Sequence, residues 1–87
     1  MPTVTDALDA NRYRELVHEA CLGANLWMSL VLAAERGDKA ACNHACEQIR
    51  TLTAATFRLV KAIGSPDPEA ELSPAMKEAK AAGAAHA

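Results

Sequence analysis

The sequence has few aromatic residues and no run of basic residues, and both shortages limit what the chain can do. Of its 87 residues only Tyr13, Trp27 and Phe57 are aromatic, although 51% are apolar. Much of the apolar content is alanine, which fills little volume, so a domain of this size is marginally stable alone. The net charge is −2 and no basic run exceeds two residues. The positive surface of a nucleic-acid binder is missing, and we predict no nucleic-acid partner.

The sequence also lacks the motifs of common enzymes. It contains no Gly-rich phosphate loop, no nucleophile elbow and no His-Glu-x-x-His motif. Four carboxylates, Glu15, Glu19, Glu35 and Glu47, are scattered along the chain and not paired. We therefore predict a protein that is not an enzyme, with no catalytic residues and no cofactor.

Signals for export or membrane insertion are missing as well. The three cysteines are an odd number, and no basic N-terminal segment leads into an apolar run with a cleavage site. We therefore predict a cytoplasmic protein with reduced thiols. The uncharged stretch 20–34 has 15 residues, which is too short to cross a bilayer as a helix. We expect protein to cover this stretch, and no membrane partner.

The rest of the chain is organised around the stretch 20–34, which is apolar on nearly every side of a helix. At about 100° per residue, one stripe with coiled-coil spacing contains Leu16, Ala20, Gly23, Trp27, Leu30 and Ala34, edged by Tyr13, Val17, Ala24 and Val31. One flank adds Leu22, Leu26 and Ala33, and the other adds Cys21, Met28 and Leu32. Such a helix is normally buried on more than one side. A single neighbouring helix therefore leaves part of it uncovered.

Capping residues divide the chain into three segments. Residues 1–8 are predicted to be a flexible lead. A two-helix hairpin follows over 9–64, with a first helix at about 9–36 and a second at about 38–63. Asp9 is the better N-cap of the first helix, and Thr5 or Asp6 could start it earlier. Gly37 ends the first helix and Asp38 caps the second at once. The short connection predicts an all-α fold built on an antiparallel hairpin.

The second helix is predicted to be amphipathic. Its apolar stripe matches that of the first helix and contains Cys42, Ala45, Ile49, Leu52, Thr56, Leu59 and Ile63. Its opposite side carries polar and charged residues, namely Asn43, Glu47, Arg50, Arg58 and Lys61. The second helix should therefore face water, while the first lies inside an assembly. Two hairpins that pair through their first helices give a four-helix bundle.

The remainder, 65–87, is a tail rich in proline and alanine. Two prolines after Gly64 stop the second helix. Ser73 and Pro74 match an N-cap and first helical position, so a short helix is predicted at 74–82, and 83–87 should be disordered. Either the tail is a solvated end, or it docks on the bundle or on a partner.

The excess of apolar surface predicts a function in protein–protein interaction, as a regulator, anti-activator, adaptor or small chaperone. The residues expected at a partner or dimer interface are Leu22, Leu26, Trp27, Met28, Leu30 and Leu32. The partner is another protein of unknown identity or a second copy in a homodimer. The sequence leaves open which of the two covers the flanks of the first helix.

The alternative function is binding of copper or zinc through thiols. His18 and Cys21 are three residues apart and Cys42 and Cys46 are four apart, so each pair can share a helix face. A hairpin closed at Gly37 places position 44 opposite position 30, which separates the two pairs by roughly 15 Å. We therefore predict no metal site within one protomer, and only a dimer could bring four such ligands together.

Overall fold

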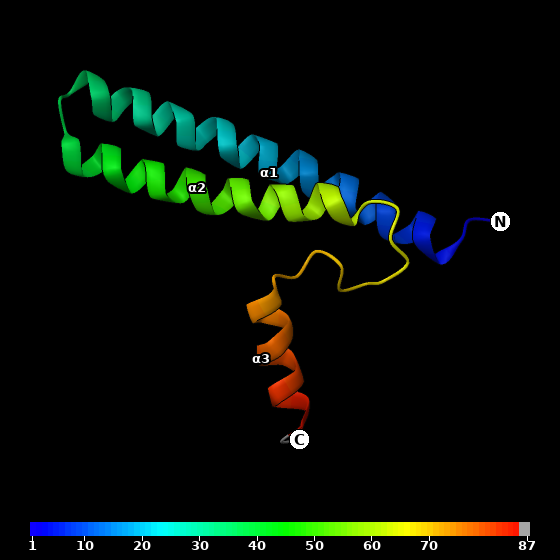
Figure 1. The fold of residues 1–87 in the computed structure, drawn as a ribbon. Helices are drawn as coiled ribbons and strands as arrows, with labels where there is room; N and C mark the ends of the chain where they lie inside the picture. Colours follow the sequence, from blue (N-terminus) through cyan, green and yellow to red (C-terminus); the bar gives the residue numbers. More distant parts are fainter. Residues whose placement is uncertain (86–87) are drawn as a thin grey trace.

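The computed structural model describes residues 1–85, which form three helices: α1 (Val4–Glu35), α2 (Lys39–Ala62) and α3 (Pro74–Ala85). Figure 1 shows α1 and α2 side by side in opposite directions, with α3 pointing away from them. The prediction of an all-α chain with an antiparallel hairpin is confirmed for these residues. One chain is present, so the pairing of two hairpins remains a prediction.

The first helix begins at Val4, five residues before the predicted start at Asp9. Thr3 is its N-cap: the Thr3 hydroxyl accepts a hydrogen bond from the Asp6 N–H, and the Asp6 carboxylate accepts one from the Thr3 N–H, both at 3.0 Å. This reciprocal capping box satisfies two amide groups that a helix start would leave unpaired. The lead predicted at 1–8 is therefore helical from Val4 onward, and Asp9 caps nothing in α1.

The hairpin turn follows the predicted pattern. Gly37 has a φ of 67°, in the left-handed region that favours glycine. Its N–H donates to the Ala34 carbonyl, and the Asp38 N–H donates to the Ala33 carbonyl, each at 3.0 Å. The Asp38 carboxylate in turn accepts from the Ala41 N–H at 3.0 Å. Both helix ends are thus satisfied within three residues, and the chain reverses direction at once.

Two contacts define the register of α1 against α2. A Cβ added to Gly23 would lie 3.6 Å from Cδ2 of Leu52, and the Thr56 hydroxyl donates to Oε1 of Glu19 at 3.0 Å. In both pairs the residue numbers add up to 75, which is within one residue of the predicted register. The α1 positions in this contact layer are Leu16, Glu19, Gly23, Leu26, Leu30 and Ala33, all buried or half-buried.

The hairpin has a small core. The buried apolar side chains in the described part of the chain are Ala33, Ala45, Leu59 and Ala62, of which only one is large. The accessible surface is 6342 Å², whereas a globular monomer of 9.2 kDa has about 4,900 Å². The radius of gyration, 16.8 Å, also exceeds the roughly 12 Å typical of this length. The chain therefore exposes about 1,400 Å² more than a compact domain.

The most deeply buried charged side chain is that of Arg12, which is 2% exposed. Its guanidinium donates to the carbonyl of Ser65 and to that of Asp67, both at 2.7 Å, and to the carboxylate of Asp9 at 2.9 Å. Its Nε lies 3.6 Å from Oε2 of Glu71. One side chain of α1 thus holds the segment after α2 in place. Arg12 was not among the residues predicted from the sequence.

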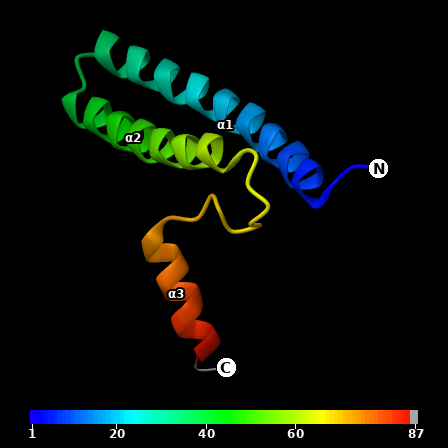
Figure 2. The same cartoon turned by 45° about the vertical axis from the view of Figure 1, so that its right-hand side comes forward.

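The last helix is separate from the hairpin. Ser73 caps it by accepting from the Met76 N–H at 3.2 Å, and the helix runs to Ala85, beyond the predicted end at 82. Residues 83–85, predicted to be disordered, are therefore helical, and residues 86 and 87 lie outside the described residues. Both views show α3 projecting from the hairpin (Figures 1 and 2). Only its first turn, at Met76, lies near α2, beside Leu59.

Replacing Arg12 with alanine should free the segment 65–71. The substitution removes three charge-assisted hydrogen bonds, and losing one such bond typically costs about 1.5–3 kcal/mol. We expect the free energy of unfolding to fall by about 2–4 kcal/mol in urea denaturation. Amide hydrogens near Ala70 should also exchange faster. Arg14→Ala is the matched control, because Arg14 is exposed and bonds only to Asn11; equal losses in both variants would contradict this role.

Asp9 should make the fold sensitive to acid. The N–H of Gly64 donates to its carboxylate at 3.0 Å, and this bond, followed by that from Arg12, lowers the pKa of Asp9 below its ordinary value of 3.8. Because the folded chain then binds fewer protons than the unfolded chain, the stabilisation is present above pH 3.8 and is lost as the pH falls below it. Asp9→Asn should flatten the decline in melting temperature below this pH, whereas Glu78→Gln on exposed α3 should leave the decline unchanged.

Candidate interaction surface

Large apolar side chains are exposed along most of α1. Between Tyr13 and Leu32 their exposed fractions range from 42% to 66%. The set consists of Tyr13, Val17, Leu22, Trp27, Met28, Val31 and Leu32. Soluble monomers rarely expose contiguous apolar patches larger than a few hundred Å², and those that do generally bind something there. This surface is therefore the candidate functional site.

Six of the α1 positions form a second stripe, which we call the outer face. They follow one another at spacings of four and three residues and are all exposed: Tyr13, Val17, Ala20, Ala24, Trp27 and Val31. The same repeat reaches Ala10 on one side and Ala34 on the other, so it contains no charged residue over eight positions. Such a repeat is typical of a helix that packs against another helix.

The contact layer of α1 differs from the predicted stripe at three positions, each displaced by one residue. Ala20, Trp27 and Ala34 belong to the stripe predicted to match that of the second helix, yet all three are exposed, and Trp27 is 57% exposed. Leu26 and Ala33 occupy the layer in their place. The displacement arises because α1 is apolar on nearly every side, so hydrophobicity alone does not determine which side meets α2.

The outer face continues onto α2. Phe57 is 64% exposed and Val60 is 50% exposed. Together with residues of α1 they line a depression of about 300 Å³, which we call the hollow; its lining is Glu19, Ala20, Gly23, Leu52, Thr53, Thr56, Phe57 and Val60. Phe57 and Val60 were not predicted from the sequence as part of a binding surface. The signal was the spacing of positions 53, 57 and 60, which repeats the helical period beside the predicted stripe.

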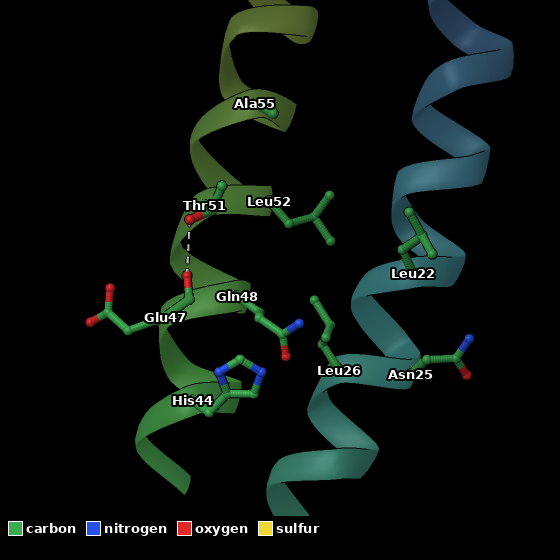
Figure 3. A pocket seen from close by; sticks show the side chains of 9 residues that line it. All are labelled: Leu22, Asn25, Leu26, His44, Glu47, Gln48, Thr51, Leu52 and Ala55. Carbon is green, nitrogen blue, oxygen red and sulfur yellow. Dashed lines mark hydrogen bonds between the residues drawn. The ribbon is translucent and has the colours of Figure 1, made fainter. Parts of the chain in front are cut away.

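A larger groove, of about 600 Å³, lies on the other side of the contact layer (Figure 3). It is lined by Leu22, Asn25, Leu26, His44, Glu47, Gln48, Thr51, Leu52 and Ala55. Leu26 and Gln48 point toward one another from the two helices, while Asn25 points away from α2 (Figure 3). The Thr51 hydroxyl donates a hydrogen bond to the backbone carbonyl of Glu47, one turn earlier in α2. The groove thus has an apolar floor, with polar groups from α2 along one edge.

The six residues predicted for the interface do not form one patch. Leu26 and Leu30 are half-buried in the contact layer. Leu22 lies at the groove. Trp27, Met28 and Leu32 are exposed, at 57%, 57% and 48%. Four of the six predicted residues are therefore exposed, with Leu22 at the groove, and two are half-buried between the two helices of the hairpin.

The cysteines are spread over the hairpin. Cys21 and Cys46 are exposed and Cys42 is half-buried. The observed register places Cys21 level with position 54, about 12 Å along the helix from Cys46. Among residues 1–85 no three His, Cys, Asp or Glu side chains are grouped closely enough to hold a metal ion. One protomer thus keeps the two predicted ligand pairs apart.

By length and composition alone, α1 could also cross a membrane. It lies alongside α2, however, and the Glu47 and Arg50 side chains of α2 are 67% and 78% exposed. These charges lie beside the most apolar part of α1. Any environment proposed for α1 must therefore also accept the charged surface of α2.

The two cysteines of α2 should differ in their contribution to stability. Cys42→Ala removes a half-buried sulfur and should lower the free energy of unfolding by about 1 kcal/mol. Cys46→Ala, one turn further along the same helix, changes an exposed side chain and should have less than half that effect. Urea denaturation of both variants measures the difference. A melting temperature that depends on zinc or copper would instead indicate that the thiols bind metal.

No family model, no curated protein and no solved structure matches this chain.

Proposed function

We propose that this chain is a non-enzymatic interaction protein that binds another protein chain through the outer face of α1. The observation that supports this most directly is the charge-free repeat from Ala10 to Ala34, whose side chains between Tyr13 and Val31 are all exposed. A contact of this kind suits a regulator, an anti-activator, an adaptor or a small chaperone, since none of these needs a catalytic group.

The small core supports the same proposal. Among the residues that the structure describes, four apolar side chains are buried and three of them are alanines, which gives the hairpin little hydrophobic stabilisation. The excess of about 1,400 Å² of accessible surface on this one chain is larger than the roughly 800 Å² that each partner of a standard protein–protein interface buries. A protein bound to the outer face would therefore supply the burial that the single chain lacks.

A protein partner fits α1 better than a lipid bilayer does. The uncharged stretch 20–34 is about 22 Å long, whereas the hydrocarbon core of a bilayer is about 30 Å thick. Extending the stretch brings in Glu19 at one end and Glu35 at the other. Insertion would also draw in the exposed Glu47 and Arg50 of α2, and charged side chains inside a bilayer are costly.

The assembly that we propose is a four-helix bundle in which two hairpins meet through their α1 helices, in the cytoplasm, where the thiols stay reduced. A different protein with a helical hairpin could take the place of one protomer. In either case Trp27 is the residue expected to contribute most to affinity, since aromatic anchors dominate helical interfaces.

The test compares two double variants with the wild-type chain. Val17→Ser/Trp27→Ser should abolish association, because polar groups replace apolar anchors on the outer face. Arg50→Ser/Lys61→Ser should preserve association, because both side chains lie on the solvent-exposed side of α2. The measurements are sedimentation at micromolar concentration and a pull-down from the native host, with circular dichroism to verify folding.

Three results would contradict the proposal. The wild-type chain could sediment as a folded monomer and capture nothing. Both double variants could recover the same partners as the wild type. The chain could also partition with the membrane fraction, which would indicate that lipid covers α1.

A further inference from the structure

We infer that a second copy of this chain covers the outer face, in antiparallel orientation about a two-fold axis near Ala24, with Trp27 of each copy seated in the hollow of the other. The inference rests on the proposed function, because it names the partner of the same surface. It follows from a protruding side chain and a depression that lie on one face of the hairpin.

Trp27 is the protruding side chain. It is the largest apolar side chain on the outer face and is 57% exposed. The hollow, of about 300 Å³, has Ala20 and Gly23 on its α1 side and Phe57 and Val60 on its α2 side. Ala20 lies two turns from Trp27 on the same helix, about 10 Å along its axis. Trp27 therefore points out beside the hollow of its own chain, and only another molecule can fill that hollow with an indole.

A two-fold axis brings the two features together. If the axis passes near Ala24, position i of one α1 lies level with position 48 − i of the other. Trp27 then lies level with position 21 of the partner copy, between positions 20 and 24, which is where a knob enters a hole in coiled-coil packing. The register of α1 against α2 places Phe57 of the partner copy within about one helical turn of that copy's position 21, measured along the hairpin. Both copies make the same contact, as a closed two-fold interface requires.

The sizes of the side chains along the outer face fit this arrangement. Ala20 and Ala24 lie at the centre, where small side chains allow two helices to approach closely. Val17 of one copy is level with Val31 of the other, so medium-sized side chains meet on either side of the centre. A parallel pair would place Trp27 against Trp27 and leave both hollows empty, which favours the antiparallel arrangement.

The available area is sufficient for a stable dimer. Trp27, Tyr13 and Phe57 are 57%, 56% and 64% exposed, and a buried aromatic side chain covers about 150–250 Å². These three residues alone therefore offer about 350 Å² of the roughly 800 Å² that each partner of a standard interface buries. The valines and alanines of the outer face, together with Val60, add to this.

Cysteine cross-linking tests the arrangement in the full-length chain. The background variant carries Cys21→Ser, Cys42→Ala and Cys46→Ser, and circular dichroism verifies its folding. A disulfide needs Cα atoms within about 7 Å, so Ala24→Cys should form a covalent dimer on mild oxidation. Val17→Cys and Val31→Cys should each stay uncrosslinked alone, yet a mixture of the two should give a covalent heterodimer, which mass spectrometry identifies.

The fluorescence of Trp27 provides a second measurement that needs no added cysteine. Trp27 is the only tryptophan in the chain, so its emission reports directly on its burial. Dilution from micromolar to nanomolar concentration should shift the emission to longer wavelength as the dimer dissociates. Phe57→Ala removes a wall of the hollow and should raise the dissociation constant at least tenfold, whereas Arg50→Ala should change it less than twofold.

Different outcomes separate this inference from the proposed function. Self-linking of both Val17→Cys and Val31→Cys would indicate a parallel pair and overturn the inference. A monomeric chain that captures a host protein through Trp27 would also overturn it, while the proposed function would stand. A monomeric chain whose captured partners do not depend on Trp27 would overturn both.

Discussion

The contact layer between α1 and α2 is the constraint on which the other features depend. It is built from side chains of modest size, with Gly23 set against Leu52 and Glu19 bonded to Thr56. The contact layer occupies one side of α1 and contains Leu26, which was predicted to lie at the partner or dimer interface. The large apolar side chains on the remaining sides of α1, from Tyr13 to Leu32, stay 42–66% exposed. The outer face is exposed because α1 is apolar on more than one side, whereas α2 is the one helix that packs against it in the described part of the chain.

Arg12 compensates for part of what the small core lacks. Its guanidinium ties two carbonyls after α2 to α1, and the carboxylate of Asp9 joins it to the N–H of Gly64. Three hydrogen bonds satisfy NH1 and NH2 of the buried guanidinium, while Nε is buried without a hydrogen bond and has only the Glu71 carboxylate, 3.6 Å away, to offset its desolvation. These contacts of Arg12 and Asp9 close the open end of the hairpin, opposite the turn at Gly37. Both ends of α2 are thereby fixed against α1 by polar contacts.

How much could be predicted from the sequence depended on how local the signal was. The hairpin and its register were predictable, because Gly37 and Asp38 fix the turn by rules that involve only neighbouring residues. The side of α1 that meets α2 was not, because apolar residues surround that helix and leave its rotation undetermined. The role of Arg12 was missed because the two carbonyls that it binds lie more than 50 residues away. The N-cap Thr3 was missed because Asp9 offered a competing cap.

The feature that made the rotation of α1 unpredictable also suits this helix to a second contact. An ordinary amphipathic helix, such as α2, has one polar side that faces water, so its single apolar side packs against one neighbour. In α1 the repeat that faces α2 and the outer face both have coiled-coil spacing, and they share no residue between Tyr13 and Ala33. The contact layer and the outer face thus use different sides of one helix, and a substitution at an outer-face position leaves the residues of the contact layer unchanged.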